Sequence, residues 1–155
     1  MVVALLVSGC HRSEPAAPAP APAPVQEKGS GGEGEDRAAT RSLQVMVNGK
    51  AGEAWTPVRI NAVAPLQVTN RNGESRGGWS LKALTSKLAG PTARVVALDA
   101  GPQRLEIAAA DWSDAKRTLV VRVTRRGEYK VHWAAADGNV GDAVLKGVER
   151  VEIAQ

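Results

Sequence analysis

The sequence contains no phenylalanine and few of the residues from which metal sites are usually made. Among its 155 residues there is one cysteine, Cys10, and there are two histidines, His11 and His132. One cysteine has no intramolecular disulfide partner, and two isolated histidines offer no zinc-binding spacing. The run over residues 137–142 resembles a calcium loop, but Val148 stands where the bidentate glutamate is needed. A polar turn is the better interpretation, and we expect no metal and no other cofactor.

Signals of catalysis are equally sparse. The Gly-x-Ser-x-Gly pattern occurs once, over Gly73–Gly77 (GESRG), but it lies in a predicted loop rather than in the sharp strand-to-helix turn that presents a nucleophilic serine. The one histidine of the domain, His132, lies in the middle of a predicted strand, so no pair of nucleophile and base is indicated. Gly77 and Gly78 precede a predicted helix, but no Lys-Ser or Lys-Thr pair follows to complete a phosphate-binding loop. Asp111 and Asp114, three residues apart, are typical of a helix cap and its solvated neighbour rather than of an acid–base pair. We therefore expect a protein that is not an enzyme.

No apolar run reaches the roughly 18 residues of a membrane-spanning helix. The run Val2–Val7 is short and leads into Ser8, Gly9 and Cys10. An apolar run followed by two small residues and a cysteine resembles the lipobox of bacterial lipoproteins. The resemblance implies that residues 1–10 form a lipoprotein signal, that the Cys10 thiol carries diacylglycerol, and that the chain is cut before Cys10 and acylated there. Two or three fatty acyl chains, palmitate among them, hold a protein firmly where one would exchange.

The lipobox resemblance has two departures. Met1–Leu6 contains no lysine or arginine, and the apolar run is shorter than the roughly 7–15 residues of an ordinary signal-peptide core. A start codon placed too far downstream explains both, and an uncleaved N-terminus with a chance match is the alternative. The resemblance implies a cell-envelope protein whose domain faces the periplasm. Where aspartate after the cysteine marks retention in the inner membrane, His11 favours the outer membrane.

Residues 11–40 read as a disordered tether, because they contain too few branched apolar side chains to bury a core. Glu14–Val25 alternates proline and alanine, a pattern that favours a semi-rigid polyproline II spacer of about 3.1 Å per residue. Glu27–Arg37 is rich in glycine and glutamate and predicts a flexible, acidic segment. A proline-rich ligand for an SH3-like partner would need the PxxP register, which this run lacks.

Residues 41–155 are enough for a single domain with one core. They hold 17 Lys+Arg and 11 Asp+Glu, a net charge of +6, whereas residues 1–40 hold 3 and 5. The basic charge therefore belongs to the folded part and favours anionic partners. The alternative is that arginine is simply the preferred surface cation of this sequence.

The hydrophobic pattern of the domain predicts an α+β fold, small, β-rich and mostly antiparallel, with one short helix. A β-sandwich with a helix is the variant. The helix runs from Leu81 to Leu88, with Ser80 as its cap and Gly90 after its end. The clearest element is a hairpin of residues 119–123 and 129–133 around a glycine-containing turn. Further strands are expected over residues 42–47, 58–63, 65–69, 93–98, 104–107 and 148–153, with loops over 70–78 and 134–142 and a capped turn over 111–114.

The outward face of the hairpin is basic and is our candidate binding surface. It comprises Arg122, Arg125, Arg126, Lys130 and His132. We hypothesise that this face binds an anionic envelope component or protein. The alternative is a solvated strand face, on which His132 is exposed because its side chain points away from its two apolar neighbours. Nucleic acid is not expected, since it needs exposed aromatics as well as cations, and the four tryptophans and one tyrosine are few enough to be core anchors.

A second resemblance covers about half of the chain. The helix WSLKAL at Trp79–Leu84, the hairpin LVVRVTRRGEYKVHW at Leu119–Trp133 and the closing KGVERVEI at Lys146–Ile153 are similar to the molybdopterin-binding domain of sulfite-oxidase-type proteins. Catalytic members of that family bind molybdenum through a cysteine inside the domain. No cysteine follows Cys10 here, so the resemblance implies a cofactor-free or redox-accessory relative. This is the alternative to a partner-binding lipoprotein.

Overall fold

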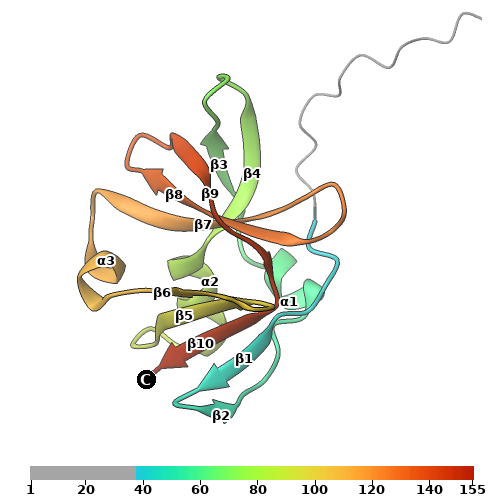
Figure 1. Cartoon of the computed structure of the whole chain (residues 1–155), viewed down its shortest axis with the longest axis vertical. Helices are drawn as coiled ribbons and strands as arrows, with labels where there is room; N and C mark the ends of the chain where they lie inside the picture. The colour runs from blue at the N-terminus through green and yellow to red at the C-terminus, as the bar shows by residue number, and fades with distance from the viewer. Residues whose placement is uncertain (1–37) are drawn as a thin grey trace, which may run out of the picture. The chain divides into compact units, whose positions relative to one another are not determined.

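The computed structural model of the chain describes residues 38–155. The lipobox and residues 11–37 of the expected tether lie outside this part. In the described residues the chain forms two five-stranded sheets and three short helices (Figure 1). This confirms the prediction of a β-rich, mostly antiparallel α+β domain. Ala39, within the predicted tether, is buried, and it exchanges hydrogen bonds of 2.8 and 3.2 Å with the Asn61 side chain.

The first sheet has the order β2-β1-β10-β5-β6. Its strands are β1 (Gln44–Val47), β2 (Lys50–Ala51), β5 (Arg94–Ala100), β6 (Gln103–Glu106) and β10 (Arg150–Ala154). Between β1 and β2, Asn48 and Gly49 both have positive φ, 48° and 78°, as a tight two-residue hairpin turn requires. β1 runs parallel to β10, and the other neighbours in this sheet are antiparallel.

The second sheet has the order β3-β4-β7-β8-β9, and the neighbours within it are antiparallel. Its strands are β3 (Leu66–Thr69), β4 (Ser75–Ser80), β7 (Arg117–Val123), β8 (Tyr129–Ala135) and β9 (Val140–Val148). Only Glu149 separates β9 from β10, so the chain passes directly from the second sheet into the first, as Figure 1 shows.

The helices are α1 (Pro57–Asn61), α2 (Leu81–Ala89) and α3 (Ala109–Ser113). The Ser80 hydroxyl accepts a hydrogen bond from the Ala83 amide at 3.4 Å, as the predicted cap requires. α2 contacts both β5 of the first sheet and β7 of the second. None of the helices in residues 38–155 is long and apolar enough to cross a membrane.

The main core fills the space between the two sheets. Val45 and Val151 contribute to it from the first sheet, and Val121 and Val131 from the second. Trp55 and Trp79 are buried in this core, as predicted for aromatic anchors, whereas Trp112 and Trp133 only pack partly against it. A residue directly before or after a core residue on these strands points to the opposite side of the sheet.

A second, smaller apolar cluster lies on the other face of the second sheet. It consists of Val68, Val120, Ala134 and Val140. The Thr69 amide donates to the Gly138 carbonyl at 3.0 Å, and Thr69 forms a parallel bridge with Asn139. This contact joins β3 to the beginning of β9, so the two ends of the sheet meet and its strands curl around the small cluster. We call the enclosed side the inner face.

Gly78 permits the close approach of β4 to β7 on the inner face. A Cβ atom at this position would lie 2.7 Å from Arg122 Cγ, 2.8 Å from the Val121 carbonyl oxygen and 3.0 Å from Val120 Cγ1. Such distances are too short for any side chain without a shift of β7. The glycine therefore allows the Arg122 stem to lie across β4.

Three local predictions were wrong. Residues 58–63 were expected to form a strand but contain most of α1, because Thr56 accepts from the Arg59 amide at 3.4 Å and Pro57 occupies the first helical position. The predicted loops over 70–78 and 134–142 contain most of β4 and the start of β9. The short turn near residue 111 is α3, which begins at Ala109 and has no side-chain cap.

We expect Gly78→Ala to lower the free energy of unfolding by about 1–3 kcal/mol, because the added methyl group overpacks the contact between β4 and β7. Gly141→Ala is the matched control, since nothing lies within 4 Å of a Cβ built there. Urea unfolding of the two variants measures the difference. Equal stability of both would show that β4 and β7 do not approach as described.

Candidate anion-binding site

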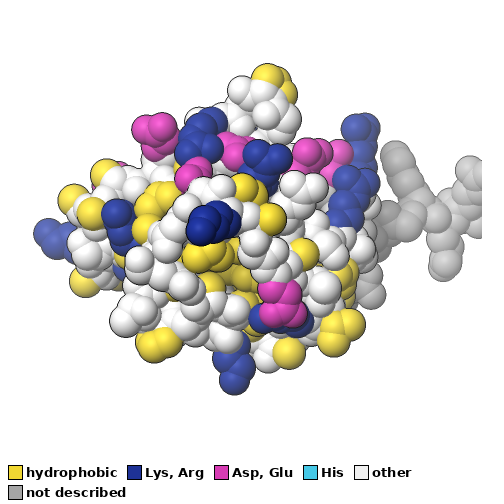
Figure 2. Space-filling model, turned by 90° about the horizontal axis from the view of Figure 1, so that it is seen from below, with side chains coloured by type: hydrophobic (Ala, Val, Ile, Leu, Met, Phe, Trp, Pro, Cys, Tyr) yellow, Lys and Arg dark blue, Asp and Glu magenta, His cyan; other side chains and the backbone are white. Residues whose placement is uncertain are grey.

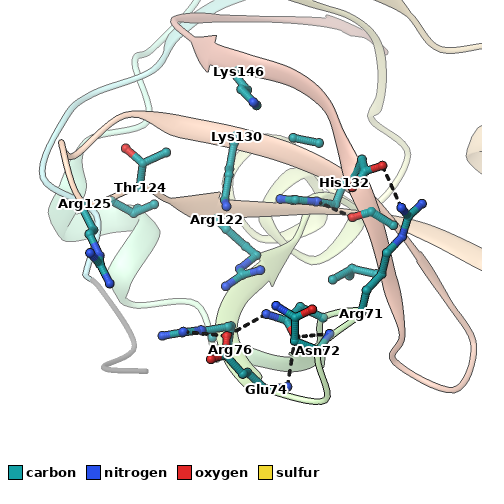
Figure 3. Close-up of a pocket in the computed structure, with 17 residues that line it drawn as sticks. Arg71, Asn72, Glu74, Arg76, Arg122, Thr124, Arg125, Lys130, His132 and Lys146 are labelled. Carbon is teal, nitrogen blue, oxygen red and sulfur yellow. Dashed lines mark hydrogen bonds and ion pairs between the residues drawn. The ribbon is translucent and has the colours of Figure 1, made fainter. Parts of the chain in front are cut away.

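A pocket of about 660 Å³ opens on the inner face of the second sheet. Figure 3 shows residues from the β3–β4 turn, β4, β7, β8 and β9 around it. Its lining holds two carboxylates, Glu74 and Asp142, and six cationic side chains, so its formal net charge is +4. The cations are Arg71, Arg76, Arg122, Arg125, Lys130 and Lys146.

Three of these cations stand in register across neighbouring strands. Arg122 of β7 lies opposite Lys130 of β8, and Lys130 lies opposite Lys146 of β9. Figure 3 shows the three side chains following one another across the strands, and we call them the cationic row. Side chains directly opposite on paired strands have Cβ atoms about 4.5–5.5 Å apart, and like charges at that spacing destabilise a sheet.

Lys130 stands in the middle of the row, opposite a cation on each neighbouring strand. Its pKa is lowered chiefly by burial, and then by the positive charges of Arg122, Lys146 and Arg76. Among residues 38–155, no carboxylate lies within ion-pair distance of Lys130 or Lys146. The row therefore concentrates positive charge on the inner face, where Arg122 and Lys130 are partly buried and Lys146 is exposed.

The two carboxylates of the pocket are engaged at its rim. Glu74 accepts from Arg76 at 2.8 Å and from the Asn70 amide group at 2.9 Å, and these bonds lower the Glu74 pKa. Asp142 pairs with Arg71 at 3.0 Å, which links the β3–β4 turn to β9 across the mouth. Both carboxylates thus pair with rim arginines, and neither forms an ion pair with Lys130 or Lys146.

His132 lies deeper than the cationic row and is only 5% exposed. Its Nδ1 is 2.9 Å from the Gly141 carbonyl oxygen, whereas its buried Nε2 makes no hydrogen bond within the described part of the chain. Burial is the main cause of its lowered pKa, to which the charges of Lys130 and Arg122 add. The expectation of a solvent-exposed His132 was wrong. The side chain does point away from the main core, but the curled second sheet covers that side as well.

Four of the five residues predicted for the basic face line the pocket: Arg122, Arg125, Lys130 and His132. Arg126 is exposed in the β7–β8 turn and is not part of the lining. Sequence reasoning missed Arg71, Arg76 and Lys146. Lys146 lies in β9, where the sequence shows no regular alternation of apolar and polar residues. The register of β9 with β8 shifts three times, and this breaks the period-two pattern of a strand.

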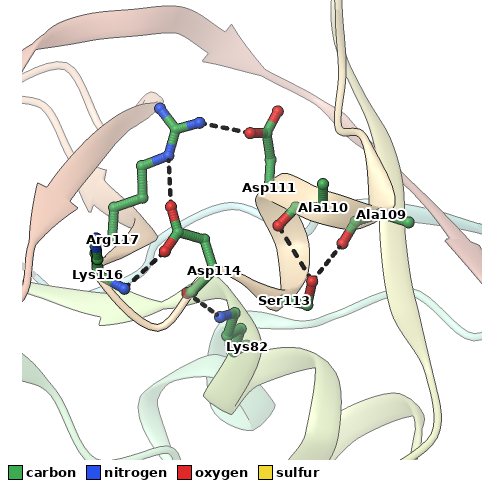
Figure 4. Close-up of polar contacts among 8 residues, drawn as sticks. All are labelled: Lys82, Ala109, Ala110, Asp111, Ser113, Asp114, Lys116 and Arg117. Atoms are coloured by element: carbon green, nitrogen blue, oxygen red, sulfur yellow. Dashed lines mark hydrogen bonds and ion pairs between the residues drawn. The ribbon is translucent and has the colours of Figure 1, made fainter.

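The aspartates considered above as a possible acid–base pair or calcium loop form ion pairs and hydrogen bonds that stabilise local structure. Asp111 and Asp114 both form ion pairs with Arg117, the second at 3.3 Å, and hold α3 against β7 (Figure 4). The Arg117 guanidinium also lies over the Trp133 ring, 4.4 Å from its centroid. Asp137 accepts from the Asn139 backbone and side-chain nitrogens at 2.9 and 2.8 Å, the geometry of a polar turn.

Charge is distributed differently on the face that Figure 2 shows. There, basic and acidic side chains are interspersed among apolar ones, and no large area carries a single sign. Away from the pocket, on the first sheet, Arg104 contacts Asp99 at 3.0 Å and also pairs with Glu152. Such mixed pairs are ordinary surface electrostatics and contribute little each. The excess of cations in the pocket is therefore not typical of this surface.

We expect the stability of the protein to rise with pH in a window just below pH 6.5, the ordinary pKa of histidine, because of His132. Its pKa is lowered on folding, so between the folded-state and unfolded-state values the unfolded chain binds more protons, and stability falls as the pH falls. Glu74 and Asp137 act in the same direction but titrate below their ordinary values of 4.5 and 3.8.

The measurement is the unfolding free energy in urea at pH 7.0 and 5.5 for the wild type and for His132→Leu. The variant removes only this titration, so we expect its stability to change less over the interval. An unchanged pH dependence in the variant would contradict the described burial of His132.

Comparisons of the chain with models of protein families, with curated proteins and with solved structures found no match. The site thus rests on its own geometry.

Proposed function

We propose that this domain is a non-catalytic binding module that holds a small anionic ligand in the pocket of the second sheet. The observation that carries the proposal is the cationic row, Arg122, Lys130 and Lys146, in register on three strands. Like charges in that position destabilise the ligand-free sheet. A bound anion removes the repulsion and forms charge-assisted hydrogen bonds with the same groups.

The shape of the pocket favours a small ligand over a polymer that passes through. The bond between Thr69 and Gly138 and the ion pair between Arg71 and Asp142 join the β3–β4 hairpin to β9 on one side. A groove for single-stranded nucleic acid would be open along its length and would present aromatic rings for stacking. The lining of this pocket contains no tryptophan or tyrosine.

We further propose that the binding module is held at a membrane by lipid on Cys10, with a tether between the two and the domain in the periplasm. The support is the run Val7-Ser8-Gly9-Cys10 and the composition of the residues that follow it. In this setting the ligand is an anionic component of the cell envelope. The sorting role of His11, which would direct the protein to the outer membrane, belongs to the same proposal.

A second candidate is a cofactor-free or redox-accessory relative of the molybdopterin-binding domain of sulfite-oxidase-type proteins. The observation that favours it is the arginine- and lysine-lined pocket around Arg122. Residues 38–155 contain no cysteine that would hold molybdenum, so we derive no metal chemistry for this pocket. Mass spectrometry of the purified protein separates the candidates, because only this one predicts a bound pterin.

We expect Lys130→Gln to weaken the binding of inorganic phosphate about tenfold, because one charge-assisted hydrogen bond is lost. The same substitution removes a partly buried, repelled charge, so the ligand-free variant should be as stable as the wild type or more stable. Calorimetric titration and thermal unfolding measure the two effects. Lys116→Gln, on an exposed residue outside the pocket, is the control of equal charge. If both substitutions weakened phosphate binding equally, the effect would come from the net charge of the protein and not from the pocket, and the site would be refuted.

Metabolic labelling with a radioactive fatty acid in a bacterial host tests the anchor. We expect Cys10→Ala to abolish the label and release the protein from the membrane fraction, because the thiol is the acyl acceptor. Ser8→Ala keeps a small residue before the cysteine and should remain labelled. Label that persists without Cys10, or is absent from the wild type, would remove lipid anchoring from the proposal.

A further inference from the structure

We infer that the pocket takes a phosphate monoester of a sugar or another polyol, with the phosphate on the cationic row and a ligand hydroxyl donating to Nε2 of His132. This inference rests on the proposed function and names the class of ligand. It depends on an acceptor atom in the pocket that the cationic row does not explain.

The hydrogen bond of His132 Nδ1 determines whether Nε2 of the same ring is a donor or an acceptor. The Gly141 carbonyl oxygen can only accept, so Nδ1, 2.9 Å away, carries the proton. Burial and the neighbouring cations keep the ring in its neutral form, and in a neutral imidazole with a proton on Nδ1 the Nε2 atom is an acceptor. That atom is buried and has no hydrogen-bond partner within residues 38–155, although His132 lines the pocket. A buried acceptor without a partner is uncommon and favours a ligand that supplies a donor.

The phosphate group of a monoester dianion does not supply that donor, because its oxygens carry no proton and only accept. His132 and Lys130 lie two positions apart on the same side of β8, which places them on the order of 6–7 Å apart along the strand. A ligand that satisfies both therefore carries an anionic group at one position and a hydroxyl group a few bonds away. A phosphorylated polyol or sugar has this combination.

The remaining surroundings agree with this class of ligand. Beyond His132, Val120 lies opposite it on β7 and belongs to the small apolar cluster with Val140, which lines the pocket. This surface suits a carbon skeleton and offers no site for a second charge. At the mouth, Glu74 and Asp142 stand beside Asn70 and Asn72. A carboxylate has lone pairs beyond those in its ion pair, and these accept hydrogen bonds from sugar hydroxyls.

The test is calorimetric titration of the full-length chain with inorganic phosphate, methyl phosphate and glucose 6-phosphate near pH 7.5. For the wild type we expect glucose 6-phosphate to bind about tenfold more tightly than methyl phosphate, the effect of one hydrogen bond to a buried acceptor. His132→Leu should reduce the affinity for glucose 6-phosphate to that for methyl phosphate, because the buried acceptor is lost. His132→Gln supplies an amide oxygen and should restore part of the preference.

The same ester can also be presented by a lipid headgroup. Phosphatidylcholine vesicles with and without phosphatidylinositol 4-phosphate form the second arm of the experiment. Tighter binding to the free sugar phosphate identifies a soluble ligand, and tighter binding to the phosphoinositide vesicles identifies a headgroup; both support the inference.

Two results overturn it, and they differ in what they leave standing. Phosphate binding that depends on Lys130 but shows no preference for either hydroxyl-bearing ester would refute the inference and leave the anion-binding function intact. No binding of inorganic phosphate or of any ester would refute both.

Discussion

The pocket depends on one backbone contact, the hydrogen bond from the Thr69 amide to the Gly138 carbonyl. It joins the first strand of the second sheet to the turn that leads into the last. Without it the inner face would be the open side of an antiparallel sheet, and its charged side chains would be surrounded by water. With it, Val68 meets Val140 in a small cluster of its own, and the polar side chains next to that cluster are drawn out of solvent. The partial burial of Lys130 and the nearly complete burial of His132 distinguish this face from an ordinary charged surface.

The charges of the pocket are arranged as in a binding site that lowers the stability of the protein when no ligand is bound. Arg122, Lys130 and Lys146 repel one another at neighbouring positions, and the pKa of Lys130 is lowered by burial and then by that repulsion. A protein selected for stability alone would place an acidic residue in one of these positions, as it does around Arg117, which binds two aspartates. Local arrangements that reduce stability and lie in a concave place are typical of functional sites.

Much of the fold could be predicted, because several of its signals are local. The β7–β8 hairpin was found from alternating apolar residues on both sides of a turn, and α2 from its leucine spacing and the Ser80 cap. The site was predicted only for the part that lies on this hairpin. Arg76 and Lys146 belong to strands whose sequences, SRGGWS and VGDAVLKGV, are rich in glycine and lack a clean alternation. These two segments form strands because they pair with and pack against neighbouring strands, not because of their own sequence pattern. The burial of His132 likewise follows from the contact between Thr69 and Gly138, which joins segments about 70 residues apart and leaves no pattern in the sequence.

The order of strands in the first sheet has a consequence for how the chain folds. β10, made last among the described elements, lies in the middle of that sheet, between β1 and β5. The parallel pairing of β1 with β10 joins Gln44 to Arg150, nearly the two ends of the domain. Neither β1 nor the main core can be completed before this segment has emerged from the ribosome, and contacts of such sequence separation form slowly. The first sheet of a nascent chain with this topology therefore forms only when synthesis of the domain is almost complete, whereas the strands of the second sheet can pair earlier.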